Sequence, residues 1–391
     1  MTTLAAGSRS AFRFFTAPLL LLFLAHTTAF SETISVGELE HVRPGTILRM
    51  WPLQGGVRTG YKGYRILYRS TGLDDEPIAV SGAVMFPEEV GVGPGRPIVA
   101  WAHPTSGVEQ PCAPSLMPDL AGNIQGIDRF TDRGYVIAAS DYAGLGAPGA
   151  HPYLVGTSAA RAVLDSVRAV RNLKSSRAGE AFVVWGHSQG GHAALFTGIH
   201  AETYAPDLDL VGVATAAPAT KLVELFELDK ATSSGRTLTS FALHSWSRVF
   251  DVPVDRFVAP HAKSAFLKLA SDCSLTIADF MKESSDEKAL AKTFLIVDPT
   301  DDPDVRTIMS ENTPGLLPAG TPVFFAQGTH DEVVRPHITR SYAAEICDGG
   351  ASVTFHDIPG GSHMWAGRDG AYAAAQWMET LFKGGAPPNH C

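Results

Sequence analysis

The sequence lacks several features that mark large classes of protein. It contains no CxxC pair, no Walker-type phosphate loop, no HExxH helix and no EF-hand loop, so no metal site or nucleotide-binding loop is expected from its motifs. It has no block of basic residues, and its formal net charge is −9, which makes nucleic acid an unexpected partner. It also has no internal repeat and no low-complexity stretch.

Long apolar runs are equally scarce, and the clearest one lies near the N-terminus. Residues 17–25 are almost wholly apolar, Arg9 and Arg13 precede them, and small residues follow. This layout predicts a secretory signal peptide over residues 1–29, cleaved after Ala29. The run is short for a membrane span, and an uncleaved N-terminal anchor is the alternative. The expected location is therefore secreted or periplasmic.

Cysteine is also rare, but its use agrees with export. The chain has four cysteines, Cys112, Cys273, Cys347 and Cys391, and all follow the predicted cleavage point. An oxidising compartment favours two disulfides among them. Four cysteines allow three pairings, and the residues alone leave all three open.

The rest of the chain alternates short apolar runs with amphipathic stretches. Helices are predicted over residues 158–173 and 372–382. Strands are predicted over residues 64–71, 78–86, 98–102, 135–140, 181–185, 210–216, 321–326 and 352–358. Because buried strands alternate with helices, the fold class is α/β, with a mainly parallel sheet and helices on both faces. The first two strands are expected to form an antiparallel edge.

The alternation stops between residues 220 and 320, where the sequence is mainly helical in character. We therefore expect one core, formed by residues 30–219 and 321–391, with a helical cap at residues 220–320 inserted before the last two strands. An apolar stripe runs along this insertion. It comprises Phe241, Ala242, Trp246, Val249 and Phe250.

The strongest local motif is Gly-His-Ser-Gln-Gly at residues 186–190. It follows a predicted buried strand and precedes a predicted helix. A serine hydroxyl is a weak nucleophile, so it must be exposed next to a base, and a tight strand-to-helix turn achieves this. The motif predicts Ser188 as the nucleophile. An ordinary glycine-rich turn is the alternative interpretation.

An acid and a base should follow the nucleophile in that order along the chain. Asp331 lies in the loop after the strand at residues 321–326 and is the predicted acid, with Glu332 as its rival. The nearby acidic residues precede that strand and are expected to be structural or solvated rather than to bind metal. They are Asp301, Asp302 and Asp304.

The predicted base is His363, which lies in a glycine-rich loop after the last predicted strand. His356 lies within that strand and is expected to be structural. The backbone N–H of Gln189 should be one donor of an oxyanion hole. Thr105 is the best candidate for the second donor, because Pro104 in the same loop has no N–H group.

A Gly-x-Gly-x-x-Gly match at residues 144–149 is not interpreted as a dinucleotide site. The helix does not begin at this motif, since Pro148 intervenes, and no suitable acid ends the next strand.

The surrounding sequence, Ser-Asp-Tyr-Ala-Gly-Leu-Gly-Ala-Pro-Gly-Ala-His-Pro-Tyr-Leu-Val-Gly at residues 140–156, resembles a signature of the secretory lipase family. This is the lipase A type of α/β-hydrolase. Trp-Ala-His at residues 101–103, Cys-Ala-Pro-Ser at 112–115 and the glycine-rich turn at 186–191 are similar to that family as well. The likeness spans about residues 44–382.

The resemblance implies an α/β-hydrolase fold, triacylglycerol lipase or carboxylesterase activity, no cofactor, and a cap that shapes an acyl tunnel. It maps the triad onto Ser188, Asp331 and His363. It also implies the disulfides Cys112–Cys273 and Cys347–Cys391. One departure is His-Pro-Thr at residues 103–105, where relatives often have His-Gly-Thr.

The expected substrate is a lipid or another apolar ester, which is compatible with contact at a lipid interface. Aromatic residues of the insertion, Phe241, Trp246 and Phe250, are candidate substrate contacts, although plain packing of the cap is the alternative for them. Two other functions compete with ester hydrolysis. One is a prolyl-type serine peptidase, which usually carries a propeller domain, and the other is a non-catalytic binding protein on the same fold.

Overall fold

The computed structural model describes residues 1–3, 36–53, 55–89, 95–274, 282, 285–290 and 294–391. The chain divides into a short unit, Met1–Ile34, and a large unit, Ser35–Cys391, which contains all the elements considered below. The signal peptide predicted over residues 1–29 falls, after residue 3, outside the described residues. Within the described ranges, no helix has the length and apolar character that crossing a membrane requires.

In the described part of the chain, a nine-stranded sheet has the order β1-β2-β3-β5-β4-β6-β7-β8-β9. The strands are β1 (Ile47–Pro52), β2 (Tyr61–Thr71), β3 (Pro77–Pro87), β4 (Arg96–Ala102), β5 (Val136–Ser140), β6 (Ala178–His187), β7 (Asp209–Ala216), β8 (Pro322–Gly328) and β9 (Ser352–Ile358). The neighbours from β5 through β4 to β9 pair in parallel. The pairs β1–β2, β2–β3 and β3–β5 are antiparallel.

The prediction of a mainly parallel sheet with an antiparallel edge is therefore confirmed, but the outermost strand is β1, which was not predicted. β1 is mostly half-exposed and ends at Pro52, and it carries the charged Arg49. Such a mixed pattern is typical of an edge strand, and it lacks the apolar run that identifies the central strands.

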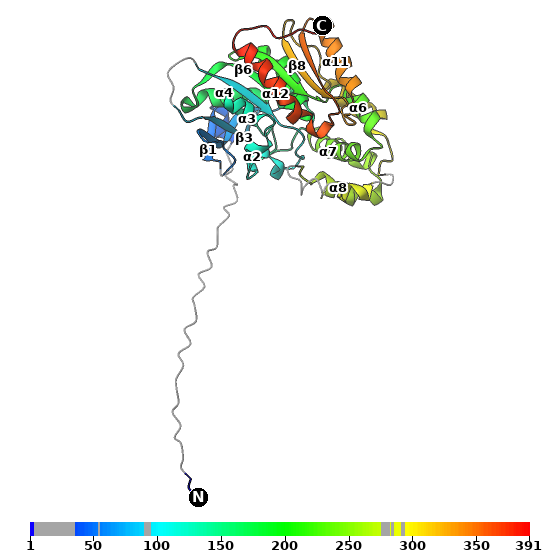
Figure 1. The fold of residues 1–391 in the computed structure, drawn as a ribbon. Coiled ribbons are helices and arrows are strands. Elements are labelled where there is room, and N and C mark those ends of the chain that lie inside the picture. The colour runs from blue at the N-terminus through cyan, green and yellow to red at the C-terminus, as the bar shows by residue number, and fades with distance from the viewer. Residues whose placement is uncertain (4–35, 54, 90–94, 275–281, 283–284, 291–293) are drawn as a thin grey trace. The chain divides into compact units, whose positions relative to one another are not determined.

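Helices cover both faces of the sheet (Figure 1). The α-helices are α1 (Val36–Glu40), α2 (Leu120–Asn123), α3 (Ile127–Asp132), α4 (Gly156–Asn172), α5 (Gln189–Tyr204), α6 (Leu222–Asp229), α7 (Ser233–Val249), α8 (Lys263–Ala270), α10 (Pro303–Glu311), α11 (Pro336–Asp348) and α12 (His363–Phe382). Short 3-10 helices are η1 (Gln110–Cys112), η2 (Pro114–Leu116), η3 (Lys174–Ser176), η4 (Val254–Arg256), η5 (Pro260–Ala262), η6 (Lys288–Leu290) and η7 (Pro299–Asp301).

Alternate residues of each central strand pack against different helices. In β4, Ile98 and Ala100 join a buried cluster with residues of α4, α5 and α11. Their neighbours Val99 and Trp101 join a second cluster with residues of α12 and of the helices between β7 and β8. This period of two explains why the strands are apolar throughout, since both faces are buried.

The closing helix begins at His363, nine residues before the predicted start at residue 372. The extra turns contain Gly367 and Gly370, which weaken the local helical pattern. A Cβ at Gly370 would lie 2.5 Å from the Cβ of Ala326 in β8, so the glycine allows α12 to approach the sheet closely. Tertiary packing therefore sets this helix start, not intrinsic propensity.

Between β7 and β8, the described residues include the helices α6, α7, α8 and α10. α6 packs on α7, and α7 packs on α8 (Figure 1). These helices follow the carboxyl end of β7, which is the same end of the parallel strands from which the loops after β6 and β8 emerge.

Candidate active site

Ser188 lies at a sharp turn between the last residue of β6 and the first residue of α5. Its φ of 57° and ψ of −118° place it in a region that residues with side chains rarely adopt. A Cβ at Gly190 would lie 2.0 Å from the carbonyl oxygen of Ala102, and a Cβ at Gly186 would lie 2.0 Å from the carbonyl oxygen of Gly190. The turn therefore requires glycine on both sides of the serine, which explains the spacing of the motif.

The hydroxyl of Ser188 contacts the imidazole of His363, which in turn contacts Asp331. His363 Nε2 lies 2.8 Å from Ser188 Oγ, and His363 Nδ1 lies 2.9 Å from Asp331 Oδ2. A carboxylate can only accept, so the neutral ring carries its proton on Nδ1 and donates it to Asp331. Nε2 is then free to accept the hydroxyl proton of Ser188.

Asp331 is held in place by donors on every side of its carboxylate. Oδ1 accepts the backbone N–H groups of Val333 at 2.9 Å and Val334 at 2.8 Å. Oδ2 accepts the side-chain amide of Gln327 at 3.2 Å. Asp331 is buried, whereas its neighbour Glu332 is exposed. The structure thus brings Asp331, and not Glu332, to the imidazole.

A second histidine supports the position of His363. The Nε2 atom of His187, the last residue of β6, lies 2.9 Å from the backbone carbonyl oxygen of His363. Burial and the nearby His363 lower the pKa of His187 to about 3. His187 is therefore neutral at physiological pH and donates from Nε2. His356, by contrast, lies within β9 and stacks on Phe324 with ring centroids 6.3 Å apart.

Gln189 and Thr105, the two residues predicted to supply oxyanion donors, come from the turn itself and from the loop after β4. Gln189 is the first residue of α5, where backbone N–H groups have no partner within the helix. The loop after β4 approaches the turn because Gly190 packs on its backbone. In that loop, Thr105 Oγ1 lies 2.9 Å from the hydroxyl of Tyr153.

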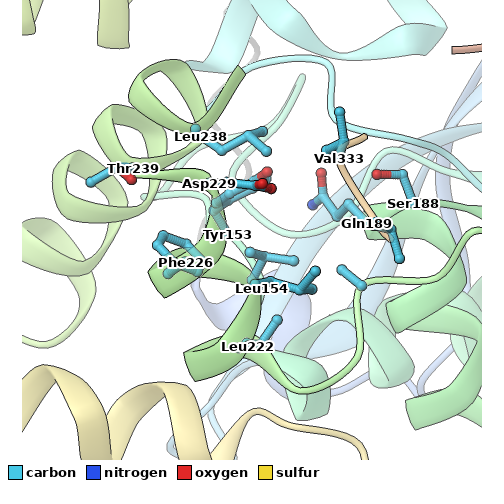
Figure 2. Close-up of a pocket in the computed structure, with 14 residues that line it drawn as sticks. Tyr153, Leu154, Ser188, Gln189, Leu222, Phe226, Asp229, Leu238, Thr239 and Val333 are labelled. Carbon is cyan, nitrogen blue, oxygen red and sulfur yellow. The ribbon is translucent and has the colours of Figure 1, made fainter. Parts of the chain in front are cut away.

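A pocket opens beside Ser188 (Figure 2). It is lined mainly by apolar side chains from the loop before α4, from α6 and α7, and from the loop after β8. The lining residues are Tyr153, Leu154, Ser188, Gln189, Ala219, Leu222, Leu225, Phe226, Asp229, Gly235, Leu238, Thr239, Val333 and Val334.

None of the three aromatic residues predicted as substrate contacts is among these lining residues. Phe241 and Trp246 are fully buried on the face of α7 that packs into the core, where the indole N–H of Trp246 donates to the carbonyl of Tyr153 at 2.9 Å. Phe250 is exposed at the end of α7. The α7 residues that line the pocket are Gly235, Leu238 and Thr239, which lie on the same side of the helix as the stripe but nearer its N-terminus.

The family-like block after β5 contributes Tyr153 and Leu154 to the lining of the pocket. The carboxylate of Asp141 accepts the hydroxyl of Ser81 at 2.6 Å and the backbone N–H of Ser115 at 2.8 Å. These bonds fix the loop that continues to His151 and Tyr153. In the sequence this block indicates only a family likeness, because no local pattern shows that Tyr153 lines a pocket.

Two disulfides join distant segments, Cys112 with Cys273 and Cys347 with Cys391. This is the pairing that the family resemblance implies. The first disulfide ties the loop after β4 to the segment that follows α8, so it couples the predicted oxyanion loop to the helical insertion.

The acidic residues before β8 act in a helix cap and an ion pair. Asp302 accepts the backbone N–H groups of Asp304 and Val305 at the start of α10. Both Asp302 and Asp304 also accept from Arg256, at 2.8 and 3.0 Å, while Asp301 ends η7. Among the side chains that the structure describes, no group of three or more His, Cys, Asp or Glu is arranged to hold a metal.

Comparison with known proteins extends these observations. A family model described as secretory lipase matches residues 123–389. A probable inactive lipase of Mycobacterium tuberculosis is 24% identical over 373 residues, covering 90% of this chain and 81% of that protein. Lipase A of Arthroderma benhamiae is 23% identical over 378 residues, covering 88% of this chain and 77% of that protein. Candida antarctica lipase A shares the fold, with a TM-score of 0.75 at 17% identity over 90% of this chain and 85% of that one.

Proposed function

The chain belongs to the secretory lipase family, and from this premise we propose that it is an exported serine esterase that hydrolyses apolar acyl esters through an acyl-enzyme on Ser188. The observation that carries the proposal is the hydrogen-bonded chain from Ser188 through His363 to Asp331, with distances of 2.8 and 2.9 Å. Family membership supports ester hydrolysis, and this geometry supports the serine mechanism.

In the first half of the reaction, His363 Nε2 takes the proton of Ser188 as the serine oxygen attacks the ester carbonyl carbon. The buried Asp331 carboxylate stabilises the imidazolium that forms. Charge develops on the former carbonyl oxygen, and the backbone N–H groups of Gln189 and Thr105 are the proposed donors to it. His363 then returns the proton to the leaving alcohol oxygen, which leaves the acyl group on Ser188.

In the second half, a water molecule takes the place of the alcohol. His363 accepts a proton from this water as the water oxygen attacks the acyl carbon, and the same donors stabilise the second tetrahedral intermediate. Collapse of that intermediate releases the carboxylic acid and returns the proton to Ser188. The enzyme is thereby restored without a cofactor.

An apolar substrate fits the pocket beside the nucleophile. Its wall is mostly leucine, valine and alanine with Phe226, so an acyl chain or an apolar alcohol would bury hydrocarbon surface there. We propose residues 220–320 as the cap, because α6 and α7 supply much of this wall. The predicted signal peptide and the two disulfides support export.

One comparison favours a second candidate function. The relative from Mycobacterium tuberculosis is named a probable inactive lipase, so a non-catalytic binding protein on this fold is the alternative. Against it stands the intact arrangement of Ser188, His363 and Asp331, since a binding protein has no need for a strained serine aligned with an imidazole.

Steady-state hydrolysis of p-nitrophenyl esters with acyl chains of increasing length tests the proposal. Purified wild-type protein should hydrolyse them, and Ser188→Ala should lower kcat by a factor of at least about 10⁴. The variant should keep the circular dichroism spectrum and thermal unfolding midpoint of the wild type. A folded wild-type protein without activity on any ester, but with affinity for an ester analogue, would favour the binding protein.

A further inference from the structure

Two hydrogen-bond acceptors interrupt the apolar wall of the pocket. Gln189 and Asp229 both line it, together with the nucleophile Ser188. Figure 2 shows the amide end of Gln189 and the carboxylate of Asp229 facing each other across the pocket, with Ser188 beside Gln189. Both side chains are buried, with exposed fractions of 4% and 5%.

The orientation of the Gln189 amide follows from its neighbour His151. His151 Nδ1 lies 2.9 Å from the carbonyl oxygen of Ala143, which can only accept, so Nδ1 carries a proton. Burial lowers the pKa of His151 to about 3, so the ring is neutral and Nε2 is an acceptor. The amide nitrogen of Gln189 lies 3.3 Å from this Nε2 and donates to it.

The same arrangement fixes the amide oxygen of Gln189 on the side away from His151. Turning the amide over would place two acceptors against each other, which is unfavourable. Within the described residues, this buried oxygen has no hydrogen-bond partner. A buried acceptor without a partner is rare in folded proteins and indicates a group that a ligand completes.

Asp229 stands at the end of α6, where Arg335 donates to its Oδ1 atom at 2.7 Å. A carboxylate has acceptor sites for further donors beyond this one. Because the guanidinium of Arg335 already balances the negative charge, a neutral donor suits the carboxylate better than a cation does. Asp229 lines the same pocket as Ser188, which locates it beside the nucleophile.

We propose that Gln189 and Asp229 form a subsite for a hydroxyl group of the substrate, so that the preferred ester carries a hydroxyl near its scissile bond. The inference rests on the proposed function, because it specifies the substrate class of the same site. The hydroxyl donates to one of the two acceptors when bound. It belongs either to the acyl chain, as in a hydroxyacyl ester, or to the alcohol, as in a partial ester of a polyol.

Paired substrates separate these two sources. On the acyl side, p-nitrophenyl 3-hydroxybutyrate is compared with p-nitrophenyl butyrate, and on the alcohol side, 2-hydroxyethyl butyrate is compared with propyl butyrate. The readout is the ratio of kcat/KM for the hydroxylated ester to that for its partner. This ratio does not depend on the fraction of enzyme that is folded, so a poorly folding variant still gives a valid result.

In at least one arm the wild-type ratio should be about tenfold or more in favour of the hydroxylated ester. Gln189→Leu and Asp229→Asn should each reduce that ratio towards one. The control Leu238→Met changes only the apolar wall and should leave the ratio unchanged.

A wild-type ratio near one in both arms, or a ratio that neither variant alters, would overturn this inference while the esterase proposal stands on hydrolysis of p-nitrophenyl butyrate. If wild-type enzyme hydrolyses none of the esters, both proposals fall.

Discussion

Replacing Asp331 by asparagine would invert hydrogen bonding around one buried side chain while leaving its shape almost unchanged. The carboxylate now accepts from His363 and Gln327 at Oδ2, and from the N–H groups of Val333 and Val334 at Oδ1. Every neighbour is a donor, so an amide must turn its own NH₂ group towards one pair of them.

The backbone donors cannot change their protonation, so the amide oxygen should stay with Val333 and Val334. The NH₂ group of the asparagine then faces His363 Nδ1, and the ring must accept there. Its proton moves to Nε2, which is the atom that has to take the proton of Ser188. We therefore expect kcat to fall about 10⁴-fold, which corresponds to about 5.4 kcal/mol of transition-state stabilisation. KM should change little, because Asp331 does not line the pocket.

The assay is steady-state hydrolysis of p-nitrophenyl butyrate by Asp331→Asn, with circular dichroism and thermal unfolding to establish that the variant is folded. Glu332→Gln is the matched control, since it removes the same charge from the next, exposed residue. The control should keep kcat within about twofold of wild type, as surface substitutions usually do. A folded Asp331→Asn enzyme within tenfold of wild-type kcat, or an equal loss in the control, would refute the reasoning.

Three further expectations concern the scaffold around the site. Replacing Cys112 and Cys273 by serine removes a disulfide that spans a sequence separation of 161. The free energy of unfolding, measured with denaturant, should fall by about 5 kcal/mol on the chain-entropy estimate. A decrease below about 1 kcal/mol would contradict this expectation. Gly190→Ala places a Cβ 2.0 Å from the carbonyl oxygen of Ala102, so the turn that carries Ser188 must shift. We expect kcat to fall by a factor of about 100 or more. An unchanged kcat would show that the turn tolerates a side chain. Burial lowers the pKa values of His151, His187 and His192 to about 3 or 4. Below the unfolded-state pKa of about 6.5 only the unfolded chain binds these protons, so the free energy of unfolding should fall as the pH falls, by up to about 1.4 kcal/mol per pH unit for each histidine. Equal free energies of unfolding at pH 7.5 and pH 5 would argue against buried neutral rings.

The sequence allowed the catalytic candidates to be predicted because each follows a strand. Parallel strands end at the same edge of a sheet, so Ser188 after β6, Asp331 after β8 and His363 after β9 were expected near one another. In the structure they lie at hydrogen-bonding distance.

The elements that could not be predicted depend on contacts between distant parts of the chain. β1 is short and half-exposed, and it is identified by its pairing with β2 rather than by its own pattern. The start of α12 depends on the fit of Gly370 against β8. In both cases the local sequence carries a weak signal and tertiary packing decides.

The residues that line the pocket are hard to identify from the sequence for a similar reason. Large aromatic residues in the insertion are natural candidates for substrate contacts, but Phe241 and Trp246 are fully buried and pack α7 against the core. The wall comes from aliphatic residues whose periodicity resembles that of any packed helix. The acceptor pair Gln189 and Asp229 comes from segments 40 positions apart in sequence, and no spacing rule connects them.

The most direct measurement is the reaction of the folded protein with a fluorophosphonate, followed by intact-mass and peptide mass spectrometry. An activated serine attacks the phosphorus and displaces fluoride, so we expect one phosphonyl group per chain, attached to residue 188. Labelling should vanish in Ser188→Ala and slow greatly in His363→Ala. A folded wild-type protein that stays unlabelled, or that is labelled at another residue, would contradict the central claim that this serine is the nucleophile.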